Sequence, residues 1–175
     1  ERFSLAFIYL VRDPRDIAVS YSNFDQTLTL DKAIERITCE SLYSHVSKKF
    51  PLDVEILGSW KFNYNSWKNG VEKVPRIIIR YEDLINNTFE TKLKIIKFLS
   101  NILNFDIDID HIEYSIQQSD FKRLQGIEKN HKFHESSNQF FNAGRVGQWQ
   151  NILTSHQTRK IENFCKDEML ELGYL

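Results

Sequence analysis

An apolar run that ends abruptly in charge is the feature that most constrains the fold of this chain. Residues 5–11, LAFIYLV, are followed at once by Arg12, Asp13, Pro14, Arg15 and Asp16. A continuous apolar run of this length is typical of a strand buried on both faces, as in a parallel sheet. Proline suits the first position of a helix, and the aspartate before it is a suitable N-cap. The stretch therefore predicts a buried strand, a tight turn and a helix.

A second segment of the same kind lies further along the chain. Residues 76–80, RIIIR, follow Pro75 and precede YEDL, and their β-branched residues favour a second buried strand. Apolar spacing and capping residues predict helices between and after the strands, over residues 31–49, 54–68, 87–103, 108–118 and 155–171. Strands joined by helices predict an α/β fold with a parallel β-sheet flanked by helices.

Residues 126–148 differ from the rest of the chain in being polar and rich in glycine. They contain three of the six glycines, Gly126, Gly144 and Gly147. A long irregular stretch inside a compact domain is usually functional or mobile. We expect this segment to be the least regular part of the chain, and its glycine end to fold over the end of the first strand.

The composition excludes several classes of protein. The 175 residues are 41% apolar, which is typical of a globular domain, and the net charge of −1 argues against binding to nucleic acid or to an anionic membrane surface. No apolar run is long enough to span a bilayer, and there is no signal-peptide pattern. Cys39 and Cys165 show no metal-ligand spacing, so we expect no metal and two reduced thiols in a cytoplasmic protein, with a single disulfide as the alternative.

The turn after the first strand is a candidate anion site. Arg12 falls at the carboxyl end of that strand, where ligands of parallel sheets bind, and Ser20 lies on the following helix. A helix N-terminus favours a phosphate, and the arginine fork matches phosphate oxygens. The alternative is that Arg12 pairs with Asp16 while Ser20 faces solvent.

Two further segments could join this site. Tyr81 follows the second strand and would emerge beside Arg12 if the strands are neighbours, where it could stack on a purine. Arg145, between Gly144 and Gly147, supplies positive charge where glycine allows close approach to a ligand. Trp149 would anchor this segment. The alternatives are a tyrosine at the rim of the core and an ordinary turn.

Taken in order, these segments resemble the PAPS-dependent sulfotransferase family, where PAPS is 3′-phosphoadenosine 5′-phosphosulfate. YLVRDPRDIAVSY is similar to the family's strand-to-helix 3′-phosphate motif, and VPRIIIRYEDLINN to its central strand and helix. GRVGQWQNILT is similar to its C-terminal glycine-rich motif. The resemblance covers essentially all 175 residues and implies a fold related to the P-loop nucleotide kinases.

The resemblance also implies roles for individual residues. It assigns Arg12 and Ser20 to the 3′-phosphate of PAPS and Tyr81 to the adenine. In QSDF, Ser119 and Phe121 match the hydroxyl and aromatic positions at the adenine. Gly144 belongs to the loop that closes on the 3′-phosphate.

Two departures from the family pattern affect this expectation. Asn142 and Ala143 stand where the family usually has Arg-Lys, and Arg145 is our candidate to replace one of the lost charges. The family's 5′-phosphosulfate loop and catalytic histidine would precede the first strand, and no such loop occurs in these residues. We therefore expect an N-terminally truncated chain, beginning at Glu1, that forms the C-terminal portion of one sulfotransferase domain, with its catalytic residues unknown.

The resemblance implies transfer of a sulfuryl group from PAPS, without a metal, to a hydroxyl or amine of a small-molecule or glycan acceptor. This chain would supply the adenosine and 3′-phosphate half of the cofactor site and would be inactive alone. The alternatives are a non-catalytic nucleotide-binding fragment and a P-loop-type phosphotransferase. Neither the acceptor nor the oligomeric state is indicated by the sequence.

Overall fold

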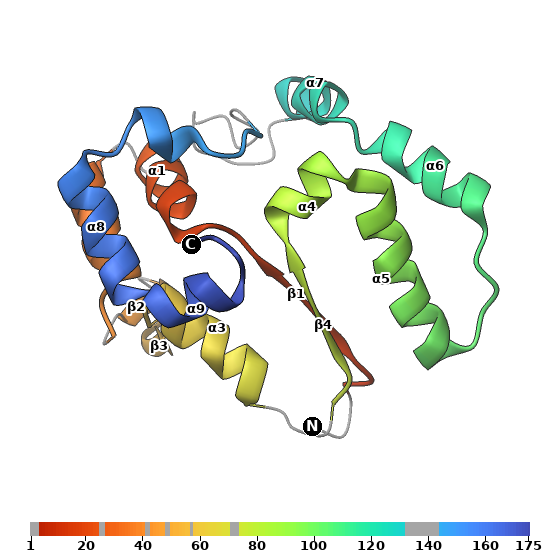
Figure 1. Cartoon of the computed structure of the whole chain (residues 1–175), viewed down its shortest axis with the longest axis horizontal. Coiled ribbons are helices and arrows are strands. Elements are labelled where there is room, and N and C mark those ends of the chain that lie inside the picture. The colour runs from red at the N-terminus through yellow and green to blue at the C-terminus, as the bar shows by residue number, and fades with distance from the viewer. Residues whose placement is uncertain are drawn as a thin grey trace. The chain divides into compact units, whose positions relative to one another are not determined.

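The computed structural model describes residues 4–24, 27–40, 43–47, 50–56, 58–70, 74–131 and 144–175 (Figure 1). The chain forms two compact units. Unit 1 comprises Glu1–Arg12 and Val74–Val146, and unit 2 comprises Asp13–Lys73 and Gly147–Leu175. Two of the three boundaries between the units fall inside segments that the sequence singles out, the strand-to-helix turn and residues 144–147, which we call the glycine segment.

Unit 1 is built on a parallel pair of strands. β1 (Phe7–Val11) pairs with β4 (Arg76–Arg80), and Val11 lies opposite Arg80. α4 (Tyr81–Asn86) and α5 (Thr88–Leu103) contact β4, α6 (Ile109–Gln118) packs on α5, and α7 (Phe121–His131) follows (Figure 1). Both predicted strands and their parallel pairing are confirmed.

The predicted burial of β1 on both faces is wrong. Ile8 and Leu10 are 43% and 52% exposed, whereas Val11 is 2% exposed. In the described part of the chain β1 pairs with β4 alone, in a two-stranded sheet. One face of such a sheet is covered while the other is open, which gives β1 an alternating burial pattern in spite of its continuous apolar sequence.

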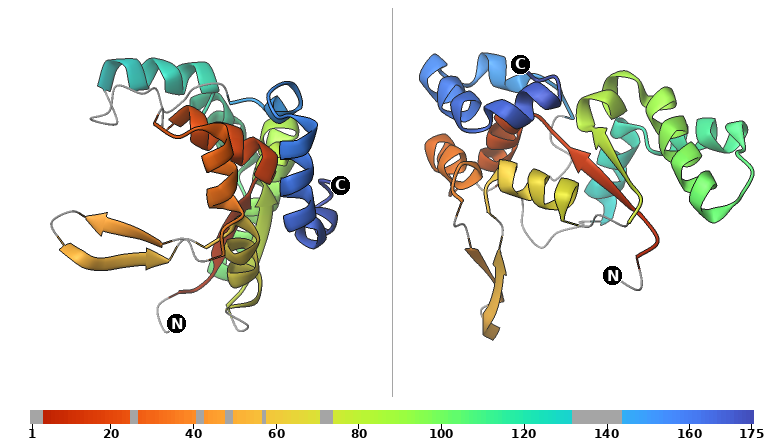
Figure 2. Two further views of the ribbon diagram at one scale, coloured as in Figure 1. Left: turned by 90° about the vertical axis from the view of Figure 1, so that its left-hand side faces the viewer. Right: turned by 60° about the horizontal axis from the view of Figure 1, so that its bottom comes forward.

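Unit 2 is a helical assembly with one hairpin. α1 (Pro14–Phe24), α2 (Leu30–Ile37) and α8 (Ser155–Phe164) pack on one another, and α3 (Trp60–Asn69), the short 3₁₀ helix η1 (Gln148–Asn151) and α9 (Lys166–Glu171) complete the unit (Figure 2). Its core is built from apolar side chains that are almost fully buried: Ala18, Val19, Ala33, Ile34, Tyr64, Ile161, Cys165 and Met169.

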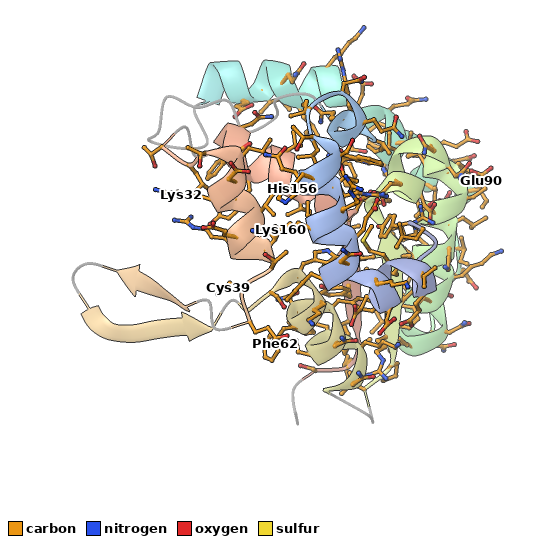
Figure 3. The ribbon with its side chains drawn as sticks, turned by 60° about the vertical axis from the view of Figure 1, so that its left-hand side comes forward. Lys32, Cys39, Phe62, Glu90, His156 and Lys160 are labelled. Atoms are coloured by element: carbon orange, nitrogen blue, oxygen red, sulfur yellow. The ribbon has the colours of Figure 1, made fainter. Side chains whose placement is uncertain are left out.

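The helices predicted over residues 31–49 and 54–68 are wrong in part. α2 ends at Ile37, α3 begins at Trp60, and between them β2 (Tyr43–Ser47) and β3 (Phe50–Ile56) form an antiparallel hairpin. The hairpin extends away from the helices of its own unit (Figures 2 and 3). The sequence FPLDVEI alternates apolar and other residues, which is the strand period that the helical interpretation overlooked. Pro51 lies inside β3, where an edge strand tolerates it.

Several helix boundaries follow from capping residues. α1 begins at Pro14 as predicted, and Asp108, the first residue of the helix predicted over 108–118, is the N-cap of α6. Thr29 caps α2, two residues before the predicted cap Asp31. α8 begins at Ser155 as predicted and is capped by Thr154, and the predicted helix over 155–171 is interrupted at Cys165. α7 makes residues 126–131 helical, so the expected irregularity is wrong there. Residues 132–143 lie outside the described residues.

The structure bears on the expectations about membrane spans, metal ligands and cysteines. Within the described ranges, no helix is both long and apolar enough to cross a membrane, and no group of three or more potential metal ligands is found. Cys165 is buried and Cys39 is exposed just beyond α2 (Figure 3), and both are free thiols. Burial in the apolar core raises the pKa of the Cys165 thiol to about 12.

Candidate functional site

The ends of the two parallel strands bring together three of the predicted site residues. Because Val11 lies opposite Arg80, the next residues, Arg12 and Tyr81, emerge side by side. The guanidinium carbon of Arg12 lies 4.5 Å from the centre of the Tyr81 ring, a cation–π distance. Arg12 Nη2 also donates a hydrogen bond of 2.9 Å to the backbone carbonyl of Arg145. The predicted neighbourhood of Arg12 and Tyr81 is therefore confirmed, and the glycine segment reaches it within unit 1.

The backbone of the glycine segment explains why glycine occurs there. Gly144 has φ of 56° and Gly147 has φ of 76°, both in the left-handed region that other residues seldom adopt. A Cβ added at Gly147 would meet only the side chain of Gln150, at 3.9 Å, so backbone conformation and not space selects glycine there. The side chain of Arg145 is exposed.

The first turn of α1 contains a buried ion cluster. Arg15 is 5% exposed and makes a forked contact with Asp13, with Nη2 2.7 Å from the carboxylate. Its Nη1 lies 2.6 Å from the Glu162 carboxylate, and its Nη2 donates to the carbonyl of Tyr174 at 2.9 Å. Hydrogen bonds and attraction to the two carboxylates raise the pKa of Arg15 in spite of the opposing effect of burial. Arg15 therefore ties α1 to α8 and to the C-terminal residues.

Asp16 binds the last residue of the glycine segment and a residue that follows it. Its carboxylate accepts hydrogen bonds from the backbone N–H of Gly147 at 2.7 Å and of Trp149 at 3.0 Å. The Arg15 guanidinium carbon lies 3.9 Å from the centre of a Trp149 ring. The predicted anchoring role of Trp149 is confirmed within unit 2. The sequence interpretation missed Arg15 and Asp16, although a cluster of charges adjoining a buried strand was a signal for them.

The N-terminus of α1 is already capped by the chain itself. The backbone N–H of Arg15 donates to the Asp13 carboxylate at 2.8 Å, and the Asp16 carboxylate lies in the same turn. These negative charges take the place that a phosphate would have at an open helix end. The partial positive charge of this helix end therefore already faces acidic side chains of its own unit.

The remaining predicted residues lie on three helices or at their ends. Ser20 is exposed on α1, in unit 2, so its convergence with Arg12 stays a prediction. Ser119 ends α6, and its hydroxyl accepts from Lys92 Nζ at 2.8 Å; partial burial lowers the pKa of Lys92. Phe121 begins α7. Asn142 and Ala143 lie outside the described residues.

Unit 1 also contains a hollow between α5 and α6. It has a volume of about 360 Å³ and is lined mainly by apolar side chains, among them Ile95, Ile96, Phe105 and Ile112. Lys92 lines it together with Asp106, Asp108 and His111, so both signs of charge are present. Charge therefore does not select one class of ligand for this hollow, and none of the predicted site residues lines it.

Comparison with known proteins identifies the family. A model of the sulfotransferase domain matches residues 4–173. The chain therefore belongs to the sulfotransferase family, the PAPS-dependent family that its motifs resemble, and has the α/β fold of that family.

The relatives share low sequence identity with the chain and are longer. Sulfotransferase 1B1 of Canis lupus familiaris is 28% identical over 169 residues, covering 93% of this chain and 54% of its own length. Amine sulfotransferase of Oryctolagus cuniculus is 22% identical over 172 residues, with 93% and 54% covered. The chain thus spans about half the length of the curated relatives that it matches.

Solved structures share the fold. Mouse sulfotransferase SULT7A1 complexed with PAP superposes with a TM-score of 0.69 at 21% identity, covering 94% of this chain and 58% of that one. Retinol dehydratase in complex with androsterone and the inactive cofactor PAP gives a TM-score of 0.66 at 17% identity, covering 94% and 47%. At these identities the likeness establishes the fold alone.

Proposed function

We propose that residues 1–175 form the C-terminal portion of a PAPS-dependent sulfotransferase domain and supply the adenosine and 3′-phosphate half of its cofactor site. The observation that carries the proposal is the position of Arg12 against Tyr81, with the carbonyl of Arg145 as its hydrogen-bond partner, at the carboxyl ends of β1 and β4. Ligands of open α/β sheets bind at this edge.

The donor set of this edge fits a purine nucleotide. An arginine backed by an aromatic ring offers a planar fork to phosphate oxygens, and a tyrosine beside it offers a face to a base. Gly144, with its positive φ, lets the backbone approach the ligand closely. The PAP present in the solved relatives supports the same ligand for this chain.

Within this site Arg12 and Ser20 bind the 3′-phosphate, and Tyr81, Ser119 and Phe121 contact the adenine. Gly144 closes on the 3′-phosphate. The exposed Arg145 supplies one of the positive charges that Asn142 and Ala143 do not provide. The exposed Ser119 hydroxyl lies at the C-cap of α6 and receives a hydrogen bond from Lys92, which orients it.

The reaction of the whole enzyme is transfer of the sulfuryl group of PAPS to a hydroxyl or amine of a small-molecule or glycan acceptor in the cytoplasm, without a metal. Relatives named for amine, 3-beta-hydroxysteroid and flavonol substrates support this range of acceptors. The residues of this chain orient the nucleotide half of the donor. Turnover requires groups that bind the 5′-phosphosulfate and deprotonate the acceptor, so we expect none from this chain alone.

Calorimetry with adenosine 3′,5′-bisphosphate and adenosine 5′-phosphate tests the proposal. We expect weak binding of the bisphosphate, and a preference for it over the monophosphate of about tenfold or more, because charge-assisted hydrogen bonds contribute about 1.5–3 kcal/mol each. Equal affinities would contradict a 3′-phosphate site. A preference for ATP with Mg²⁺ would favour the phosphotransferase alternative. Measurable turnover of PAPS with a panel of phenols would contradict the proposal that this chain supplies only half of the cofactor site. It would support sulfotransferase activity.

A further inference from the structure

The buried charges of the first turn of α1 have no role in the proposed site as described so far. Asp13, Arg15 and Asp16 are 5%, 5% and 1% exposed. Burying ionised groups is unfavourable unless they are paired and hydrogen-bonded. Asp13 pairs with Arg15, and Arg15 and Asp16 bond residues more than 130 positions away. Such a cluster therefore does more than begin a helix.

We propose that Asp16 and Arg15 are positioning residues that hold the glycine segment, residues 144–147, in the conformation that recognises the 3′-phosphate. The proposal rests on the proposed function and adds two residues to it. Asp16 acts on the C-terminal end of the segment through Gly147, and Arg15 acts through Trp149. Neither side chain needs to touch the nucleotide.

The Asp16 carboxylate is suited to this role because it accepts two converging N–H groups, one on each oxygen. Gly147 donates to Oδ2 and Trp149 to Oδ1. Hydrogen bonds to a charged acceptor are stronger than neutral ones, and these two fix the backbone on both sides of residue 148. An asparagine has nearly the same shape but only one acceptor oxygen, and its NH₂ group would face an N–H donor. We call the two hydrogen bonds that Asp16 accepts the Asp16 clamp. Asp16→Asn therefore breaks the clamp with almost no change in side-chain volume.

Arg15 contacts the side chain of the same tryptophan whose N–H bonds Asp16. Its guanidinium lies on the Trp149 ring while its N–H groups bond Asp13, Glu162 and the Tyr174 carbonyl. This arrangement uses the planar fork of arginine, which lysine cannot reproduce. At the other end of the segment Arg12 bonds the Arg145 carbonyl. The Arg12 contact lies within unit 1, and the Asp16 contacts with Gly147 and Trp149 lie within unit 2.

The first test measures the clamp itself, without nucleotide. Amide hydrogen exchange followed by NMR should show Gly147 and Trp149 exchanging about tenfold faster or more in Asp16→Asn than in the natural chain. Asp31→Asn is the matched control, because Asp31 is also a first-turn carboxylate, is exposed, and bonds the side chain of Gln157. Unchanged exchange at Gly147 and Trp149 in folded Asp16→Asn overturns the proposal.

The second test asks whether the clamp acts on the 3′-phosphate. We expect Asp16→Asn to weaken adenosine 3′,5′-bisphosphate about tenfold and to leave adenosine 5′-phosphate within about twofold, whereas Asp31→Asn changes neither. Faster exchange with an unchanged ratio of the two affinities overturns the positioning role while the proposed function stands. If the natural chain does not prefer the bisphosphate over the monophosphate, the proposed function is contradicted. In that case the exchange rates of Gly147 and Trp149 still show whether Asp16 holds them.

A second variant keeps the proposal testable if Asp16→Asn fails to fold, because it leaves every charge of the buried cluster in place. Gly147→Ala adds a methyl group that meets only the Gln150 side chain, so it acts through the positive φ of 76° and not through a clash. It should lower the preference for the bisphosphate about fivefold or more, since about 1 kcal/mol of strain at this position corresponds to that factor. An unchanged preference in folded Gly147→Ala overturns the proposal.

Discussion

The two parallel strands of this protein end in junctions that look alike in sequence and differ in structure. β1 ends at Val11 and is followed by RDPRD, and β4 ends at Arg80 and is followed by YED. After β1, the charges turn inward and fasten α1 to α8, to η1 and to the C-terminal residues. After β4, Glu82 is buried 3.9 Å from Arg80, and Tyr81 lies against Arg12.

The residues after β1 bind and hold other parts of the chain, whereas Tyr81 after β4 lies with its ring against Arg12. The side chains and backbone groups bound by the charges after β1 belong to unit 2, and the contact of the tyrosine with Arg12 lies in unit 1. Both patterns place an arginine at the carboxyl end of a strand, so position on the sheet edge alone does not assign a role. The partners that each arginine and carboxylate meets decide it.

The largest expected effect concerns the ion cluster after β1. Arg15→Ala leaves Asp13 buried without its forked partner, and we expect a loss of about 3–5 kcal/mol in the free energy of unfolding measured with urea. Lys68→Ala, which removes an exposed pair with Glu171 in the same unit, is the control and should change stability by about 1 kcal/mol or less. Equal effects of the two substitutions would show that the cluster contributes no more than a surface pair.

The second effect separates the two strand-end arginines. Arg12→Ala should weaken adenosine 3′,5′-bisphosphate by about 1.5–3 kcal/mol, roughly tenfold to a hundredfold, in calorimetry. Arg80→Ala should change this affinity about threefold or less, because Arg80 lies beside Glu82. A larger loss in Arg80→Ala than in Arg12→Ala would reverse the roles of the two junctions.

The third effect concerns the ionisation of Tyr9 on β1 at alkaline pH. Burial raises the pKa of Tyr9 on β1 to about 12, whereas its neighbour in register, Ile78, has no titrating group. The neutral tyrosine is thus favoured in the folded state, so its stabilisation is complete below pH 10 and is lost as pH rises through about 12. Because Tyr9 is only partly buried, solvent screens part of this effect, so from pH 9 to 11 the natural chain should lose about 0.5–1 kcal/mol more stability than Tyr9→Phe. Parallel losses in urea melts of the two proteins would contradict this expectation; Cys165 titrates in the same sense in both.

The smallest expected effect concerns Tyr81 itself. Tyr81→Ala removes the aromatic face beside Arg12 and should weaken the bisphosphate by about 1 kcal/mol, roughly fivefold, whereas Tyr81→Phe keeps the face and should lose about half of that or less. Calorimetry on both variants gives the measurement. Equal losses would assign the contribution of Tyr81 to its hydroxyl and not to its ring.

The sequence by itself determined the elements that depend on local patterns and the parts of the site that follow from them. Apolar runs predicted β1 and β4, Pro14 and Asp108 predicted helix starts, and parallel pairing predicted that Arg12 and Tyr81 would meet. These succeed because periodicity and capping act over a few residues, and because parallel strands bring their carboxyl ends to the same edge.

Only the tertiary structure decided how the charges after β1 are used, which face of β1 is open, and that residues 43–56 form a hairpin. Arg15 and Asp16 meet Glu162, Tyr174 and Trp149, all of them more than 130 residues away in sequence. A buried ion is stabilised by partners that the chain brings together only on folding. For that reason the strand-to-helix turn could be predicted from the sequence, whereas only the folded structure shows that its Asp16 accepts hydrogen bonds from Gly147 and Trp149.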